Sequence, residues 1–260
     1  MLDTIINEFP KYFPEMNNVI SAGIPVFARV AGLMRTAPFL QRNEIPMIAK
    51  TGFALILTIM ILMILKPAAQ PSDVSIIYAI VVNFLCGAIL GFIVNCIVKA
   101  IESGGDMINM QQGVSSATIM DPTTSSQISI MGRIFSIFGL IIFLEIGGAY
   151  WTFNAFIRTF EIFPIYAYAI PMEEIINMPY LVKITSNVLY IGLQIAAPVL
   201  IATLGQDIIL GIISKTAPQV NVFQMSFLFK PCLGAAILIL IMPSLFNVIS
   251  DFFLSFSNIF

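Results

Sequence analysis

Long stretches of this chain contain few charged residues or none, and this feature limits what the chain can fold into. Val74–Val98 has no charged residue, and neither has Ile184–Gln206. Of all 260 residues, 58% are hydrophobic and 10% are charged, whereas soluble globular proteins carry about 25% charged residues. A compact fold of this length could not hide so much apolar surface from water. The sequence therefore predicts an all-α membrane protein.

Several apolar stretches are candidates for membrane helices. Besides those two they are Thr51–Leu65, Ile134–Ile157, the pair Thr216–Phe229 and Pro231–Ser250, and the weaker Val19–Met34. A helix needs about 20 apolar residues to cross the hydrocarbon core, so we expect roughly five or six spanning segments. Thr51–Leu65 is short, and Pro198, Pro231 and Pro243 interrupt other stretches. Because short or broken helices are tolerated where protein surrounds them, we expect helical hairpins with kinked or broken helices in a packed assembly.

The absence of histidine and the scattered positions of the cysteines exclude several classes of catalytic and metal site. The chain has no histidine, which removes Ser-His catalysis and His-ligated metals. Cys86, Cys96 and Cys232 lie in apolar stretches without a C-x-x-C spacing, so we expect three buried core residues. No phosphate-loop motif is present, and a net charge of −2 gives no basic patch for nucleic acid. We therefore expect no enzyme activity, metal or cofactor.

One polar segment, Gly104–Gln127, lies between two long apolar stretches. It is rich in Gly, Ser, Thr and Gln, and Asp121-Pro122 marks a turn or a helix boundary. One interpretation is a surface loop between two membrane helices. The other is a pore constriction, because unbranched methionines adapt to varied objects and glycines let the backbone rearrange.

Residues Met107–Pro122 resemble the central signature of the FliR family of flagellar export-gate proteins, whose virulence counterparts are the injectisome T components. The matching residues are Gln111 or Gln112, Gly113, Ser115, Ala117, Asp121 and Pro122. Three further regions are similar to the family in the same order, namely Phe27–Pro46, Phe143–Gly148 with Phe163-Pro164, and Lys215–Phe223. Many flagellar members have Gly-His at Gly147-Gly148 and Arg at Lys215, so the flagellar or virulence branch stays open.

The resemblance implies a subunit of a protein-conducting channel in the bacterial inner membrane, at the flagellar basal body. Residues 1–180 would resemble the P component and residues 181–260 the Q component. One copy would join five P copies and four Q copies, with the B component, and pass unfolded flagellar subunits. Segment 104–127 would plug this channel without making or breaking a bond. The implied plug residues are Met107, Met110, Gln111, Gln112, Gly113, Ser115, Ser116, Met120, Asp121 and Pro122.

Several charged residues are candidates for intramembrane charges or subunit contacts. Glu145 is the only charge in Ile134–Ile157, and intramembrane carboxylates are functional candidates. A structural role is favoured, in which Glu145 pairs with a basic residue of another helix or faces an aqueous cavity. Asp207 is expected near a helix end. The full set is Arg29, Arg35, Arg133, Glu145, Arg158, Asp207 and Lys215.

Two other classes of function stay open at this point. A multi-pass secondary transporter could use broken helices and an internal carboxylate, but the sequence shows no internal repeat. An aspartyl intramembrane protease is hinted at by Ser103-Gly-Gly-Asp106, which lacks the expected first glycine.

Overall fold

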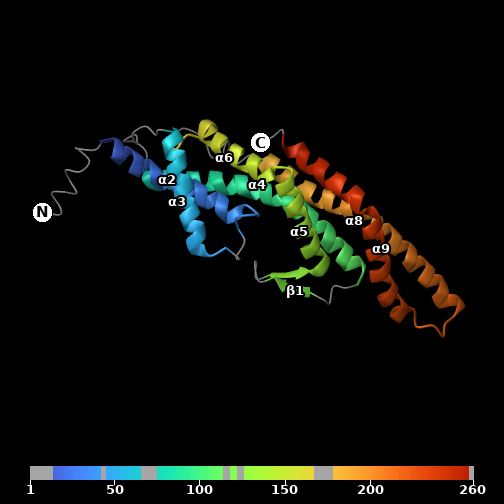
Figure 1. The fold of residues 1–260 in the computed structure, drawn as a ribbon. Helices are drawn as coiled ribbons and strands as arrows, with labels where there is room; N and C mark the ends of the chain where they lie inside the picture. Colours follow the sequence, from blue (N-terminus) through green and yellow to red (C-terminus); the bar gives the residue numbers. More distant parts are fainter. Residues whose placement is uncertain are drawn as a thin grey trace. The chain divides into compact units, whose positions relative to one another are not determined.

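The computed structural model describes residues 14–41, 45–65, 75–113, 118–121, 126–166 and 178–257. Within them the chain is almost entirely helical (Figure 1). The helices are α2 (Pro14–Thr36), α3 (Met47–Leu65), α4 (Ile76–Gln111), α5 (Ile130–Glu145), α6 (Gly148–Ile162), α8 (Met178–Thr216) and α9 (Val222–Ser257). Two short strands, β1 (Thr118–Asp121) and β2 (Ser126–Ser129), pair antiparallel, with Thr118 opposite Ser129. The predicted all-α class is confirmed, apart from this small addition.

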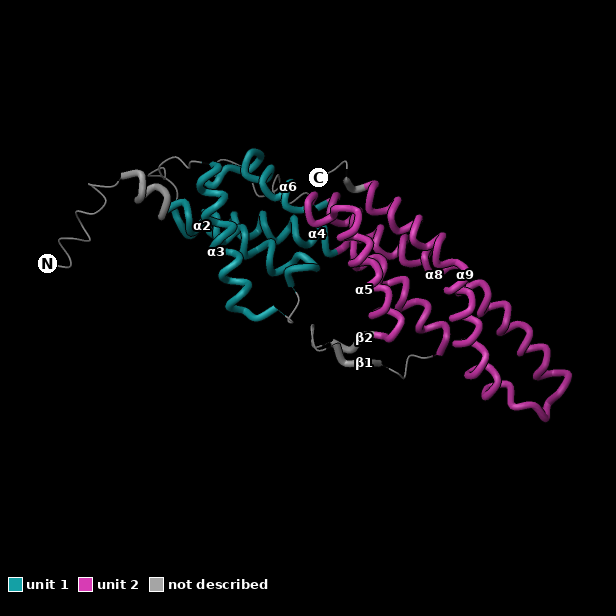
Figure 2. Tube along the Cα trace, in the orientation of Figure 1, with its two compact units in different colours: residues 1–95, 152–178 teal, residues 96–151, 179–260 magenta. Residues whose placement is uncertain are grey.

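The chain divides into two compact units (Figure 2). Unit 1 consists of Met1–Asn95 and Thr152–Met178, and unit 2 of Cys96–Trp151 and Pro179–Phe260. Each unit is therefore assembled from two separate parts of the chain. The predicted division into a P-like part and a Q-like part concerns likeness to other proteins, and it stays a prediction.

In unit 1, α2 packs against α3 and also lies very close to α4. A Cβ added at Gly87 of α4 would overlap the carbonyl oxygen of Arg29, and one at Gly32 of α2 would overlap that of Phe84. The hydroxyl of Thr36 donates to the carbonyl oxygen of Ala88 at 3.0 Å. Small residues let helix backbones approach this closely, and such contacts are typical of membrane helix pairs.

In unit 2, the second half of α4 packs against α8, and α5 packs against α9. The hydroxyl of Ser103 reaches the carbonyl oxygen of Val188 on α8 at 3.3 Å. The rings of Phe143 on α5 and Phe253 on α9 meet edge to face, with centroids 5.4 Å apart. Helices α8 and α9 are joined through residues 217–221, which lie within the family-like region Lys215–Phe223.

In the part of the chain that the structure describes, four helices are long and apolar enough to cross a membrane: α3, α4, α8 and α9. The count rises to five if the bent pair α5 and α6 is one span, against the roughly five or six expected. Helices α4, α8 and α9 have 36, 39 and 36 residues, which corresponds to lengths of about 54–58 Å. They are therefore much longer than the hydrocarbon core of a bilayer, about 30 Å thick.

Some details of the predicted stretches are wrong. Helix α3 begins at Met47, so the stretch predicted to be short has 19 helical residues. Ile134–Ile157 is not one helix, because α5 ends at Glu145 and Gly147 takes a positive φ of 85° before α6. Pro198, Pro231 and Pro243 lie inside α8 and α9 and do not end them.

Two single residues also differ from expectation. Cys232 is exposed, whereas Cys86 and Cys96 are buried as predicted. Asp207 lies in the interior of α8 and not near a helix end, because α8 continues to Thr216. The carboxylate of Asp207 instead pairs with Lys230 of α9 at 2.8 Å, which gives the charge a partner within the apolar hairpin.

Candidate functional site

The polar segment Gly104–Gln127 does not have one uniform structure. Helix α4 continues through its first part and ends at Gln111. Gly113 then takes a φ of 72°, which reverses the local backbone and which glycine adopts without strain. The chain next forms β1 and β2 and enters α5. Helix α4 therefore extends beyond the apolar stretch that ended at Val98 and includes the first residues of the polar segment. Both interpretations of the segment, a loop and a constriction, apply to the residues after this helix.

Glycines in this part of α4 serve close packing. A Cβ at Gly104 would lie 3.0 Å from the carbonyl oxygen of Gly192 on α8. One at Gly105 would lie 2.6 Å from the carbonyl oxygen of Met131 on α5. Helix packing against both neighbours therefore outweighs the low helix propensity of the two glycines.

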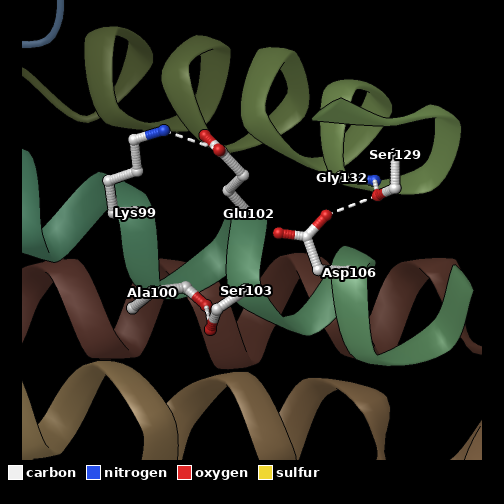
Figure 3. Close-up of polar contacts among 7 residues, drawn as sticks. All are labelled: Lys99, Ala100, Glu102, Ser103, Asp106, Ser129 and Gly132. Atoms are coloured by element: carbon white, nitrogen blue, oxygen red, sulfur yellow. Dashed lines mark hydrogen bonds and ion pairs between the residues drawn. The ribbon is translucent and has the colours of Figure 1, made fainter. Parts of the chain in front are cut away.

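Asp106 and Ser129 join the two ends of the segment (Figure 3). The hydroxyl of Ser129 donates to the Asp106 carboxylate and also accepts the backbone N–H of Gly132 at 2.9 Å. Ser129 is the N-cap residue of α5, with an extended φ of −66° and ψ of 151°. Gly132 leaves the necessary room, because a Cβ there would overlap the Asp106 carboxylate. The chain thus leaves α4 and returns to α5 at one point, which we call the base of the segment.

Two buried amides follow this base, one in the last turns of α4 and one directly after its end. Asn109 and Gln112 are only 2% and 1% exposed. The side-chain oxygen of Asn109 and both polar atoms of Gln112 have no hydrogen-bond partner among the described residues. The Gln112 amide packs directly over Gly234 of α9, where a Cβ would overlap it. Buried polar atoms without partners are costly, and the packing of Gln112 on Gly234 acts beside the backbone hydrogen bonds that close this end of α4.

The other predicted plug residues differ in their surroundings. Met110 is 73% exposed, whereas Met107 and Gln111 are half-buried and Gly113 is exposed. Met120 and Asp121 belong to β1. Ser115, Ser116 and Pro122 lie outside the described residues.

One turn before Asp106, an ion pair faces α5. The ammonium of Lys99 is 2.5 Å from the carboxylate of Glu102 (Figure 3). The Glu102 side chain is 10% exposed and that of Lys99 46% exposed. The pair neutralises a carboxylate that would otherwise be costly to keep near the helix interface.

Arg29 is fully buried inside unit 1. Its Nε donates to Asn83 Oδ1 at 2.9 Å, and its Nη1 and Nη2 donate to the carbonyl oxygens of Thr159 and Phe163 at 2.9 and 2.7 Å. The guanidinium also lies 4.0 Å from the centroid of the Phe160 ring. Burial lowers the pKa of Arg29 to about 10, so the group stays protonated at neutral pH. A cation here stabilises the C-terminal carbonyls of α6.

The remaining predicted charges lie in more open surroundings. Arg35, Glu145, Arg158 and Lys215 are exposed, and Arg133 is half-buried. Glu145 is the last residue of α5, next to the break before α6. The structure brings Asp207 to Lys230, a residue outside the predicted set.

Comparison with known proteins identifies the family. The family model for bacterial export proteins, family 1, matches residues 20–256. The chain belongs to this family. Relatives include the flagellar biosynthetic protein FliR of Escherichia coli, which is 27% identical over 239 residues that cover 86% of this chain and 89% of the relative. FliR of Bacillus subtilis is 27% identical over 250 residues, covering 92% and 93%.

A relative with a different name is also similar. The surface presentation of antigens protein SpaR of Salmonella typhimurium is 24% identical over 233 residues, covering 89% of this chain and 85% of the relative. The predicted membership of the FliR family of type III export-gate proteins is confirmed.

The sequence prediction of the site omitted several residues that the structure makes prominent. Ser129 could have been found, because a serine directly before an apolar run is an N-cap signal. Asp106 belongs to the polar segment Gly104–Gln127, but its partner Ser129 is 23 positions away. Residue spacing could not indicate a contact over that distance. Gly234 and Asn109 carry no local signal, since their role depends on which helices pack together.

Proposed function

We propose that this chain is a structural and gating subunit of a flagellar type III protein export channel in the bacterial inner membrane. The observation that carries the proposal is the family match across residues 20–256. Flagellar proteins named FliR align along nearly the whole chain. The four apolar helices agree with residence in a membrane.

Segment 104–127 is proposed as the plug, and the base geometry supports this role. Because Asp106 and Ser129 hold α4 and α5 together at the base, a rearrangement of the plug need not separate these two helices. Met110, which is 73% exposed on the final turns of α4, offers a flexible thioether to a passing chain. Closing would block water and ions, and a substrate polypeptide would displace the plug.

The partners follow from the same proposal. We infer that one copy joins several copies of the P and Q components, five and four by family likeness, together with the B component. Exposed apolar side chains on α8 and α9 support contacts with other membrane proteins or lipid. Phe223 is 83% exposed, Leu240 79% and Ile201 70%. Helices of about 54–58 Å are longer than a bilayer is thick. This length favours an arrangement in which other proteins surround part of each helix.

Removal of residues 114–128 tests the plug role with the least damage. A wider deletion of 107–122 would also remove the last turn of α4 and Gln112, which packs over Gly234. Gly113 lies seven residues beyond Asp106, about 10 Å along the helix, so a linker of about four Gly and Ser residues replaces 114–128 and spans this distance to Ser129. This design is expected to keep that packing, and it retains both Asp106 and Ser129. The deletion is expected to raise ion leak through the assembled channel, measured as dye-reported collapse of the membrane potential in cells.

Native mass spectrometry of the complex supplies the necessary control. The deleted chain should still join the P and Q components with wild-type composition. A leak equal to wild type in a correctly assembled complex would contradict the plug role. A wild-type chain that ignores those partners would contradict the channel assignment itself.

A virulence-type export subunit is the second candidate, because SpaR aligns over 89% of this chain. The two candidates differ in their partners and substrates. Restoration of motility in a flagellar mutant lacking its FliR protein would favour the flagellar branch. Restoration of injectisome secretion, with no motility, would favour the other.

A further inference from the structure

A cavity of about 500 Å³ lies between α2 and α3 in unit 1. Phe27 and Met34 of α2 form apolar walls, and Met47 and Ala54 of α3 form others. Cavities of roughly 300–1,000 Å³ with mostly apolar walls and a few polar groups are typical of ligand sites. The cavity belongs to neither the base of the segment nor the buried Arg29 network.

Two cations line this cavity. They are Arg35, near the end of α2, and Lys50, in the first turn of α3. The Lys50 ammonium donates to the carbonyl oxygen of Gln41 at 3.1 Å, and an ammonium has two further N–H donors. None of the described lining residues is acidic. A ligand that carries negative charge is therefore expected beside these two groups.

The position of α3 indicates where such a ligand comes from. Helix α3 is one of the candidate membrane spans, and it contributes both lining residues and exposed apolar side chains. Ile48 is 85% exposed and Met63 72% exposed. Because Lys50 is within the first turn of this span, it lies where a helix meets the headgroup region. Basic pockets between membrane helices at this level bind anionic headgroups.

We propose that this cavity binds the phosphate headgroup of an anionic phospholipid. The guanidinium of Arg35 and the ammonium of Lys50 contact the phosphate oxygens, and one acyl chain follows the apolar surface of α3. The apolar walls distinguish a lipid from a free phosphate, which would gain nothing from Phe27 or Met34. The binding site does not depend on the plug.

Native mass spectrometry of the full-length chain in mild detergent tests the site. The probe is dioleoyl phosphatidylglycerol, with dioleoyl phosphatidylcholine as the zwitterionic comparison. Arg35→Gln with Lys50→Gln should weaken phosphatidylglycerol binding roughly 30-fold, since each cation near a membrane surface is worth about a factor of five. The matched control removes two exposed cations outside the cavity, Lys183→Gln with Lys215→Gln, and should retain wild-type binding.

A second variant fills the cavity without changing its charge. Thr51→Trp places an indole against the lining and should also abolish the specific binding, with the thermal midpoint used to confirm folding. Equal binding of phosphatidylcholine, equal loss in the control variant, or no loss in Thr51→Trp would overturn the proposal. Displacement of the lipid by millimolar glycerol phosphate would instead identify a site for soluble phosphates and would also overturn it.

Discussion

The hydroxyl of Ser129 donates a hydrogen bond to the carboxylate of Asp106, although the two residues lie 23 positions apart. The same oxygen caps α5 by accepting the N–H of Gly132. One side chain thus fixes both the start of α5 and its position against α4. The segment between them is closed at its base, and a loop closed in this way has less conformational entropy to lose when it adopts one position.

Substitution of Ser129 by Ala should loosen this base. The loss of the N-cap alone costs about 1 kcal/mol, and the Asp106 carboxylate loses a donor as well. We expect faster hydrogen–deuterium exchange of the backbone amides in β1 and in the first turn of α5. Exchange in α3, which belongs to unit 1, should stay unchanged.

Ser214→Ala is the matched control. The Ser214 hydroxyl donates only to the carbonyl oxygen of Gly211 in its own helix, so its removal should not alter exchange at β1. Asp106→Asn retains an acceptor oxygen for Ser129 and should lie between wild type and Ser129→Ala. Wild-type exchange in Ser129→Ala would show that the base is held by backbone packing alone.

Arg29→Gln should lower the free energy of unfolding of unit 1 by about 3 kcal/mol. The change leaves the part-buried carbonyl oxygens of Thr159 and Phe163 without their donor, and an acceptor that is buried without a partner costs about 1–3 kcal/mol. Arg29→Lys should rescue little, because one ammonium lacks the planar fork that reaches both carbonyls. Thermal unfolding in detergent measures the effect.

The loss should be the same at pH 6 and pH 8. The pKa of Arg29 is lowered by burial only to about 10, so the folded protein loses this proton only as the pH rises through that value. Lys183→Gln, at an exposed position on α8, should leave unfolding unchanged. A marked pH dependence of the Arg29→Gln effect between pH 6 and 8 would point to a different group.

Gly87→Ala should separate α2 from α4. The added Cβ would overlap the Arg29 carbonyl oxygen, which is backbone and cannot turn away as a side chain could. Overpacking of this kind costs about 1–3 kcal/mol. Gly211→Ala on α8 has no atom within 4 Å of the new Cβ, so it should be neutral or slightly stabilising. Gly87→Ala should therefore lower the thermal midpoint. Gly211→Ala should leave it unchanged or raise it slightly.

Hydropathy predicted the helical membrane class but not where the helices end. Gly104 and Gly105 looked like loop residues, yet they lie inside α4 because their missing Cβ atoms admit α8 and α5. Conversely, Ile134–Ile157 is mostly apolar, with Glu145 as its one charge, and it still breaks at Gly147, whose positive φ no hydropathy scale detects. A glycine can therefore lie inside a helix, where it allows close packing, or at a turn that ends a helix. Local composition does not distinguish these two roles, so it misplaces the helix boundaries.

The candidate site shows the same limit at longer range. The segment that contains the plug residues was recognisable from its family signature, whereas Asp106–Ser129 and Gln112–Gly234 depend on contacts between helices. One long-range pair could have been inferred. Asp207 is ten residues before Ala217 and Lys230 nine residues after Asn221, so a hairpin with its turn at 217–221 places them opposite each other.

A double-mutant cycle on Asp207 and Lys230 tests that pair. The two groups are 2.8 Å apart, with side chains 37% and 18% exposed. Exposed pairs are worth about 0.2–1 kcal/mol, but an unpaired charge on an apolar helix costs more. Asp207→Asn and Lys230→Gln should each lower the thermal midpoint, and the double variant should lose less than the sum of the two.

The coupling in this cycle decides between two roles for Asp207. A coupling of about 1 kcal/mol or more would assign the residue to the α8–α9 hairpin, where it neutralises Lys230. Strictly additive losses would mean that the two charges act separately, and the prediction of a subunit contact for Asp207 would then gain support. Measuring the cycle both in the isolated chain and in the complex with the P and Q components separates these roles, because only a subunit contact makes Asp207→Asn more damaging in the complex.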